Sequence, residues 1–118
     1  MNIQTQFDYR DKTSRIVSWL NNKQARDILA LDVKASNSIT DSVVIASATS
    51  IRHAQALADM LMEMFSEQAL EVLGLEGYRP GTWILIDCND VVVHIFQEGE
   101  RGFYNLEGLW SKAPRLEL

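Results

Sequence analysis

Residues 83–96 read WILIDCNDVVVHIF, and this stretch decides the fold. Its two halves, residues 83–87 and 91–96, are rich in the β-branched and aromatic residues that favour strands. Only Cys88, Asn89 and Asp90 lie between them, and an asparagine tolerates the left-handed backbone that a tight turn requires. The stretch therefore predicts a β-hairpin.

The two faces of this hairpin follow from the alternation of side chains along a strand. We take Cys88 and Asn89 as the central residues of the turn, so that Asp87 lies opposite Asp90 and Trp83 lies opposite His94. One face then carries Trp83, Leu85, Val92 and His94. The other face is purely aliphatic, which suits a core beneath a helix, and it carries Ile84, Ile86, Val91 and Val93.

The clearest helix precedes the hairpin, over residues 51–68. Ser50 is a favourable N-cap for it. Apolar side chains recur at steps of three and four residues and form one wide face, made of Ala54, Leu57, Ala58, Leu61 and Phe65. Just before this helix, residues 42–48 (SVVIASA) predict a buried strand.

The remaining elements have weaker signals. Residues 13–23 predict a helix with Asp11 or Thr13 as its cap, and residues 99–110 predict a short final helix. Strands are predicted at residues 27–33 and 71–74, and turns or loops at residues 34–41 and 76–81.

The predicted order is therefore helix, two strands, helix, three strands, helix. Strands in two groups favour an α+β protein with a mixed sheet of about five strands. We expect a single domain over residues 1–118, with its core at about residues 12–112.

Composition limits the classes of protein. The chain has 118 residues, of which 47% are hydrophobic, and a net charge of -5. Cys88 is the only cysteine, which excludes an internal disulfide and a cysteine zinc cluster. The polar N-terminus lacks the apolar run of a signal peptide, and no stretch reaches the ~18 apolar residues that span a bilayer. We therefore expect a cytoplasmic protein that enters no membrane. Its acidity favours a basic protein surface over bare nucleic acid.

Few side chains could carry catalysis. Asp87 and Asp90 flank the turn, and together with Asp41 they could hold a metal for a nucleotidyltransferase-like reaction. The preference of aspartate for turns explains the same pattern. His53 and His94 have no partner at a suggestive spacing, and the six glycines form no phosphate loop. We therefore expect no enzyme, metal or cofactor, and keep the metal-dependent enzyme as an alternative.

Aromatic side chains give a better signal, and it is one for binding. Tryptophan is common at the energetic centres of protein interfaces, although Trp83 could equally close the edge of the core. The C-terminal part is also rich in large apolar side chains. These either pack on the domain or present a patch, and they are Phe103, Tyr104, Leu106, Leu109 and Trp110.

Three separated segments resemble the ribosomal silencing factor S family, also called Iojap-like. The first is SITD at residues 38–41 with VVIASATS and then Arg52-His53. The second is Gly77 followed by residues 83–87 and 90–96. The third holds Arg101, Phe103-Tyr104, Leu106-Glu107 and Leu109-Trp110. The resemblance covers about residues 12–115 and implies a fold similar to that of nucleotidyltransferases, without their activity.

The resemblance also implies a translational repressor. Such a protein would bind the large ribosomal subunit through ribosomal protein L-fourteen and sterically block joining of the small subunit when nutrients are scarce. Within the matched segments and the loop before them, we predict that the contacts are made by Glu76, Trp83, Asp87, Asp90, Tyr104, Leu109 and Trp110. A homodimeric scaffold, joined through the last helix or the hairpin edge, is the remaining alternative.

Overall fold

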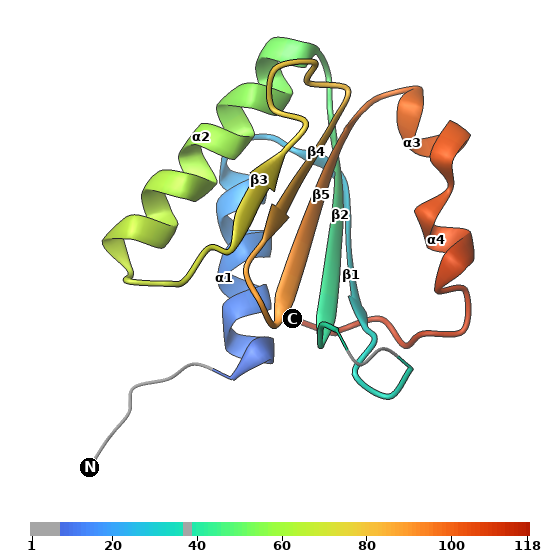
Figure 1. Cartoon of the computed structure of the whole chain (residues 1–118). Helices are drawn as coiled ribbons and strands as arrows, with labels where there is room; N and C mark the ends of the chain where they lie inside the picture. Colours follow the sequence, from blue (N-terminus) through green and yellow to red (C-terminus); the bar gives the residue numbers. More distant parts are fainter. Residues whose placement is uncertain (1–7, 37–38) are drawn as a thin grey trace.

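The computed structural model describes residues 8–36 and 39–118. Its elements, labelled in Figure 1, are α1 (Tyr9–Asn22), β1 (Arg26–Asp32), β2 (Ser42–Ala48), α2 (Ile51–Glu67), β3 (Gly74–Glu76), β4 (Trp83–Asp87), β5 (Val91–Gln97), α3 (Glu100–Tyr104) and α4 (Leu106–Leu109). The strands form one sheet in the order β1-β2-β5-β4-β3. β2 and β5 run parallel and the other neighbours run antiparallel. The predicted α+β fold with a mixed five-stranded sheet is therefore confirmed.

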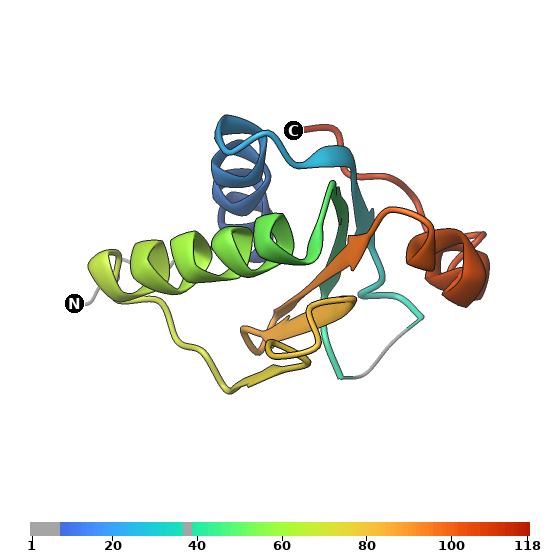
Figure 2. The same cartoon turned by 90° about the horizontal axis from the view of Figure 1, so that it is seen from above.

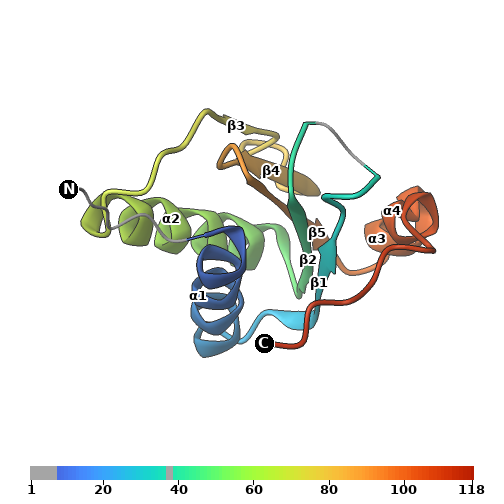
Figure 3. The same cartoon turned by 90° about the horizontal axis from the view of Figure 1, so that it is seen from below.

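The sheet separates two layers of helices. Figures 2 and 3 show α1 and α2 on one side of the sheet and the short helices α3 and α4 on the other. We call these two sides the α1–α2 face and the α3–α4 face. Among the described residues, none of the helices combines the length and the apolar character that crossing a membrane would take.

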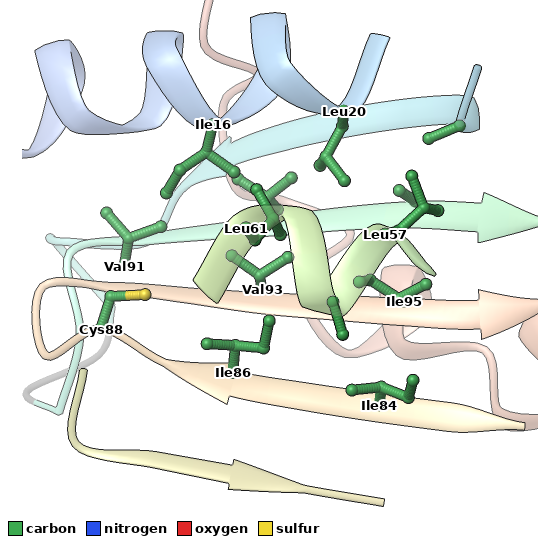
Figure 4. Close-up of a cluster of buried hydrophobic side chains, with 14 of the residues drawn as sticks. Ile16, Leu20, Leu57, Leu61, Ile84, Ile86, Cys88, Val91, Val93 and Ile95 are labelled. Atoms are coloured by element: carbon green, nitrogen blue, oxygen red, sulfur yellow. The ribbon is translucent and has the colours of Figure 1, made fainter. Parts of the chain in front are cut away.

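The main core lies on the α1–α2 face, where α1 and α2 pack on alternate residues of the strands (Figure 4). The predicted apolar face of α2 is buried in full, from Ala54 to Phe65. The aliphatic hairpin residues are buried opposite it, as predicted: Ile84, Ile86, Val91 and Val93. Each fully buried side chain of this kind contributes roughly 1.5–3 kcal/mol, so this layer is the main source of stability.

The hairpin turn differs from the prediction. The Cys88 amide donates to the Val91 carbonyl at 2.8 Å, so Asn89 and Asp90 are the central residues, and Asn89 has φ 76°. The predicted pairing of Trp83 with His94 is therefore wrong, because Trp83 lies opposite Phe96. The predicted faces are still right. Each strand keeps its alternation, so moving the turn by one residue changes the pairs and leaves every side chain on its face.

Contacts far along the chain explain the position of this turn. The Asp90 carbonyl accepts from the amides of Asp41 and Ser42, at 3.0 Å each. Its carboxylate accepts from the Lys12 ammonium at 2.5 Å. Lys12 also donates to the Cys88 carbonyl at 3.3 Å, and its side chain is only 10% exposed. The turn is thus held by α1 and by the start of β2.

Helix α1 begins one turn earlier than predicted. Asp8 is its N-cap, and the Asp8 carboxylate accepts from the Asp11 amide at 3.0 Å, so the predicted caps Asp11 and Thr13 are wrong. Thr13 lies inside the helix, where its hydroxyl bonds to the Tyr9 carbonyl and to the buried Ser42 hydroxyl. The predicted end near residue 22 is confirmed.

Two further elements are shifted or divided. The strand predicted at residues 71–74 lies at Gly74–Glu76, because its pairing with β4 sets Glu76 opposite Leu85. The single final helix predicted over residues 99–110 is broken into α3 and α4 at Asn105, whose φ of 50° is left-handed. The turn predicted at residues 34–41 includes residues 37–38, which lie outside the described part.

The C-terminal residues return to the sheet. The Asp32 amide donates to the Pro114 carbonyl at 2.8 Å, and the Leu116 amide donates to the Ala30 carbonyl at 2.9 Å. Residues 114–116 therefore pair with the outer edge of β1, where Leu31 and Arg115 form an antiparallel bridge. Leu116 packs against the main core, so the tail crosses from the α3–α4 face to the α1–α2 face.

Candidate protein-binding surface

The α3–α4 face is covered over only part of its width. A small second core of Leu31, Val33, Val43, Ile45 and Phe96 lies under α4 and the following turn. Trp83, Leu106 and Trp110 pack around it. Beyond this cover lie β3, β4 and the start of β5. There Leu85, Asp87 and Val92 are half-buried and Glu76 is exposed. We call this region the uncovered part of the sheet, and it lies beside α3 and α4 (Figures 1 and 2).

Trp83 joins the sheet to the C-terminal helices. Its ring stacks on Phe96 with 5.0 Å between centroids, and Tyr104 of α3 lies 4.7 Å away on a tilted plane. The indole Nε1 donates to Nδ1 of His94 at 3.0 Å. Trp83 therefore closes the edge of the second core and remains half-exposed beside the uncovered part of the sheet. Its role at a protein interface stays a prediction.

His94 fixes the orientation of that indole. It is 5% exposed, and burial lowers its pKa to about 4. The imidazole is therefore neutral near pH 7, with Nδ1 accepting from Trp83 and its proton on Nε2. His94 is thus a packed, neutral neighbour of Trp83. His53 is likewise structural, because its Nδ1 accepts from the Thr49 amide and its Nε2 bonds to the Lys23 carbonyl.

The C-terminal helices expose a patch of large apolar side chains. Phe103 is 80% exposed, Leu109 is 71% exposed and Tyr104 is 44% exposed. Leu106 and Trp110 face the other way and pack on the second core. The segment thus both packs on the domain and presents a patch. Clustered exposed apolar side chains of this kind mark binding surfaces.

Six of the seven predicted contact residues gather on this side of the molecule. Glu76 and Asp87 lie on the uncovered part of the sheet, and Trp83 lies between it and α3. Tyr104, Leu109 and Trp110 belong to the α3–α4 segment. Asp90 lies apart, in the hairpin turn, with its carboxylate on Lys12. The contacts of these seven residues with a partner stay a prediction.

The aspartates suspected of metal binding have other partners. Asp87 accepts from the Asn89 amide at 2.9 Å, which is turn chemistry. Asp90 pairs with Lys12, and the Asp41 amide bonds to the Asp90 carbonyl. In residues 8–36 and 39–118, no three histidine, cysteine or acidic side chains converge as metal ligands would.

Sequence reasoning missed the roles of Lys12 and Arg101. Arg101 of α3 reaches Asp27, Ser47 and Glu107, and its side chain is only 13% exposed. Lys12 lies in a polar N-terminal segment, and nothing local in the sequence marks it as buried. Arg101 lies in a segment rich in aromatic residues, but two of its three partners lie 54 and 74 positions away in the sequence.

Comparisons with known proteins agree with this structure. The family model described as ribosomal silencing factor during starvation matches residues 6–118. The ribosomal silencing factor RsfS of Halalkalibacterium halodurans is 42% identical over 86% of this chain and 87% of its own length. That of Bacillus subtilis is 39% identical over 83% of each chain. A crystal structure from Chromobacterium violaceum superposes with a TM-score of 0.86 at 28% identity, covering 89% of this chain and 88% of the other. The chain therefore belongs to the ribosomal silencing factor family, also called Iojap-like.

Proposed function

We propose that this ribosomal silencing factor docks on ribosomal protein L-fourteen of the large subunit and thereby keeps the small subunit from joining. Membership of the family supports the broader part, which is non-enzymatic silencing of the ribosome during starvation through the large subunit. The proposal adds the protein contacted, the docking surface and the location, which is the cytoplasm.

One observation carries the docking surface. The α3–α4 side of the molecule carries two acidic side chains on the uncovered strands, Glu76 and Asp87, and the exposed apolar side chains of α3 and α4. A protein interface needs an apolar centre and a charged rim. The acidic rim suits a basic ribosomal protein, because opposite charges speed encounter and set orientation. The α1–α2 face offers less, since two helices cover it.

At such a position, the size of the molecule is sufficient to block the small subunit sterically. The smallest dimension of the molecule is 22 Å. A folded body of that thickness, bound where two subunits meet, separates surfaces that must approach to hydrogen-bond distance. No catalytic group is needed for this effect, and occupancy of the site sets its strength.

The docking surface is tested by charge reversal with a matched control. Glu76→Lys should weaken binding to purified large subunits by about 1 kcal/mol or more, since it places a cation against a basic partner. Glu63→Lys makes the same change at an exposed position of α2, on the opposite side of the sheet, and should bind like the wild type. Equal losses in the two variants would show that net charge, and not this surface, drives binding.

The apolar part is tested by Leu109→Ser and Trp83→Ala in sedimentation with separated subunits. Each should weaken binding, and Trp83→Ala should cost about 2 kcal/mol or more as an interface centre. Circular dichroism must show that Trp83→Ala is folded, because Trp83 also packs on the second core. Wild-type protein that sediments only with the small subunit, or with neither, would refute the proposal.

Direct contact with L-fourteen is tested with the purified ribosomal protein. Purified L-fourteen should bind the wild-type protein and compete with the large subunit for it. Subunit joining, followed by light scattering, should then recover as L-fourteen is added. Binding to large subunits that resists this competition would point to another ribosomal protein.

The exposed apolar patch also supports a second candidate state, a homodimer of the free protein. Phe103 is 80% exposed and Leu109 is 71% exposed, and exposed apolar patches are common sites of protein association. A dimer through this patch would compete with the ribosome for one surface. Sedimentation equilibrium should then show a dimer that Leu109→Ser reduces to a monomer, and a wild-type monomer at all concentrations would exclude it.

A further inference from the structure

Arg101 is the polar centre of the contact between the C-terminal helices and the sheet. Its Nη1 donates to the Asp27 carbonyl at 2.5 Å and to the Ser47 hydroxyl at 3.0 Å. Its Nε and Nη2 both reach one carboxylate oxygen of Glu107, at 3.2 and 3.1 Å. One side chain thus links α3 to α4, to β1 and to β2.

The sheet is shaped to receive this side chain. The register between β1 and β2 shifts between Arg26 and Leu29, and Asp27 has a left-handed φ of 50°. Such a bulge leaves a residue out of the ladder, so the Asp27 carbonyl is available to Arg101. Ser47 is 3% exposed, and on the strand it alternates with the residues of the main core, so its hydroxyl lies on the α3–α4 face.

The two helices need such an anchor. α3 spans Glu100–Tyr104 and α4 spans Leu106–Leu109, and helices this short are not stable alone. The left-handed Asn105 between them also breaks the helix, so α3 and α4 cannot stabilise each other as one continuous helix. The tail at residues 114–116 holds the far end of the segment on β1. Arg101 holds the near end.

We propose that Arg101 is a positioning residue for ribosome binding. It fixes α3 and α4 against the sheet, so that Tyr104 stays beside Trp83 and the exposed Leu109 is held in place on α4. Arg101 acts without touching the partner, because four of the five N–H groups of its guanidinium are directed at Asp27, Ser47 and Glu107 and its side chain is only 13% exposed. This inference rests on the proposed function, since the surface it positions is the docking surface.

Arginine is required by this geometry. The planar guanidinium offers donors in three directions at once, whereas a lysine ammonium is a single point on a flexible stem. Arg101→Lys keeps the charge and should not restore binding. Arg101→Met removes the charge and keeps much of the apolar stem. Glu107→Gln leaves Arg101 on the sheet and weakens only its link to α4, so it is the milder test.

The experiment combines affinity for the large subunit with hydrogen exchange. Arg101→Met should weaken binding by about tenfold or more, because freed side chains must be ordered again on docking. Arg101→Lys should behave like Arg101→Met, and Glu107→Gln should show a smaller loss. The hydrogen-bonded amides of Asn105, Gly108 and Trp110 should exchange faster in all three variants, while the amides of α2 stay at their wild-type rates.

Coupling to Leu109 distinguishes positioning from contact. If Arg101 acts through the helices, Arg101→Met and Leu109→Ser together should weaken binding by less than the product of their separate effects. If their effects multiply and the exchange rates do not change, Arg101 contacts the partner directly and the inference is wrong. Faster exchange in α3 and α4 with unchanged affinity also overturns it.

Two outcomes separate this inference from the proposal on which it rests. A wild-type protein that does not bind the large subunit overturns the proposed function, and the inference falls with it. Wild-type binding that none of the three variants weakens overturns the inference alone. If Arg101→Met fails to fold, Glu107→Gln decides, since the contacts of Arg101 with Asp27 and Ser47 remain in that variant.

Discussion

Acidification should destabilise this protein through one buried histidine. His94 is 5% exposed, and burial lowers its pKa to about 4, whereas an unfolded chain has a histidine pKa of about 6.5. The neutral ring is therefore favoured in the folded state, and its contribution is complete above pH 6.5. As the pH falls, the unfolded state binds the proton first and stability is lost. These two pKa values give a loss of roughly 2 kcal/mol at pH 5, approaching about 3 kcal/mol near pH 4.

Urea unfolding at pH 7.5 and pH 5.0, followed by circular dichroism, measures this loss. His94→Phe has no proton to bind, so the difference between the two pH values should shrink by roughly 2 kcal/mol relative to the wild type. Phe103→Ser changes an exposed side chain and leaves His94 in place, so it should keep the wild-type difference. Tryptophan fluorescence should also change on acidification, because protonated Nδ1 cannot accept from Trp83. An equal pH difference in the wild type and His94→Phe would refute the reasoning.

Three substitutions test other parts of the fold. Lys12→Met removes the ammonium that bonds to the Asp90 carboxylate and the Cys88 carbonyl. Urea denaturation at pH 7 should show a loss of about 1–3 kcal/mol in the free energy of unfolding. Adding Asp90→Asn to the same chain should recover part of that loss. Phe65→Ala empties a 1% exposed site at the end of α2, and the same measurement should show a loss of about 3–5 kcal/mol. Ser50→Ala removes the N-cap of α2 and should cost about 1 kcal/mol in thermal unfolding, whereas Ser50→Gly should cost only a few tenths.

The main layers could be predicted from the sequence because their signals are local. Periodic apolar residues marked α2, and Ser50 marked its start, and both were confirmed. The faces of β4 and β5 followed from strict alternation, which survives an error in the turn. Family motifs added the function, which no composition or spacing could supply.

Two of the errors, at the hairpin turn and in the last helix, coincide with contacts to residues far away in the sequence, whereas the earlier start of α1 reflects a local cap at Asp8. The turn moved to Asn89 and Asp90 because Lys12, Asp41 and Ser42 bind Asp90. The last helix broke at Asn105 because packing of Trp110 and pairing of the tail with β1 fix where the chain must go. Six of the seven predicted contact residues lie on one side of the sheet because strand alternation and the C-terminal segment place them there, and their contacts with a partner stay a prediction. The anchoring role of Arg101 was missed because two of its three partners, Ser47 and Asp27, lie 54 and 74 positions away.

The pairing of residues 114–116 with β1 has a consequence for self-association. A β-sheet normally has two edges, and each can recruit a strand from another molecule. Here the chain's own end covers part of the β1 edge, and only β3, three residues long, is left free at the other side. Pairing of further molecules at the β1 edge is therefore hindered where the tail lies, and the short β3 offers few backbone groups for such pairing at the other edge. Removing the last five residues should uncover the β1 edge and allow further molecules to pair there.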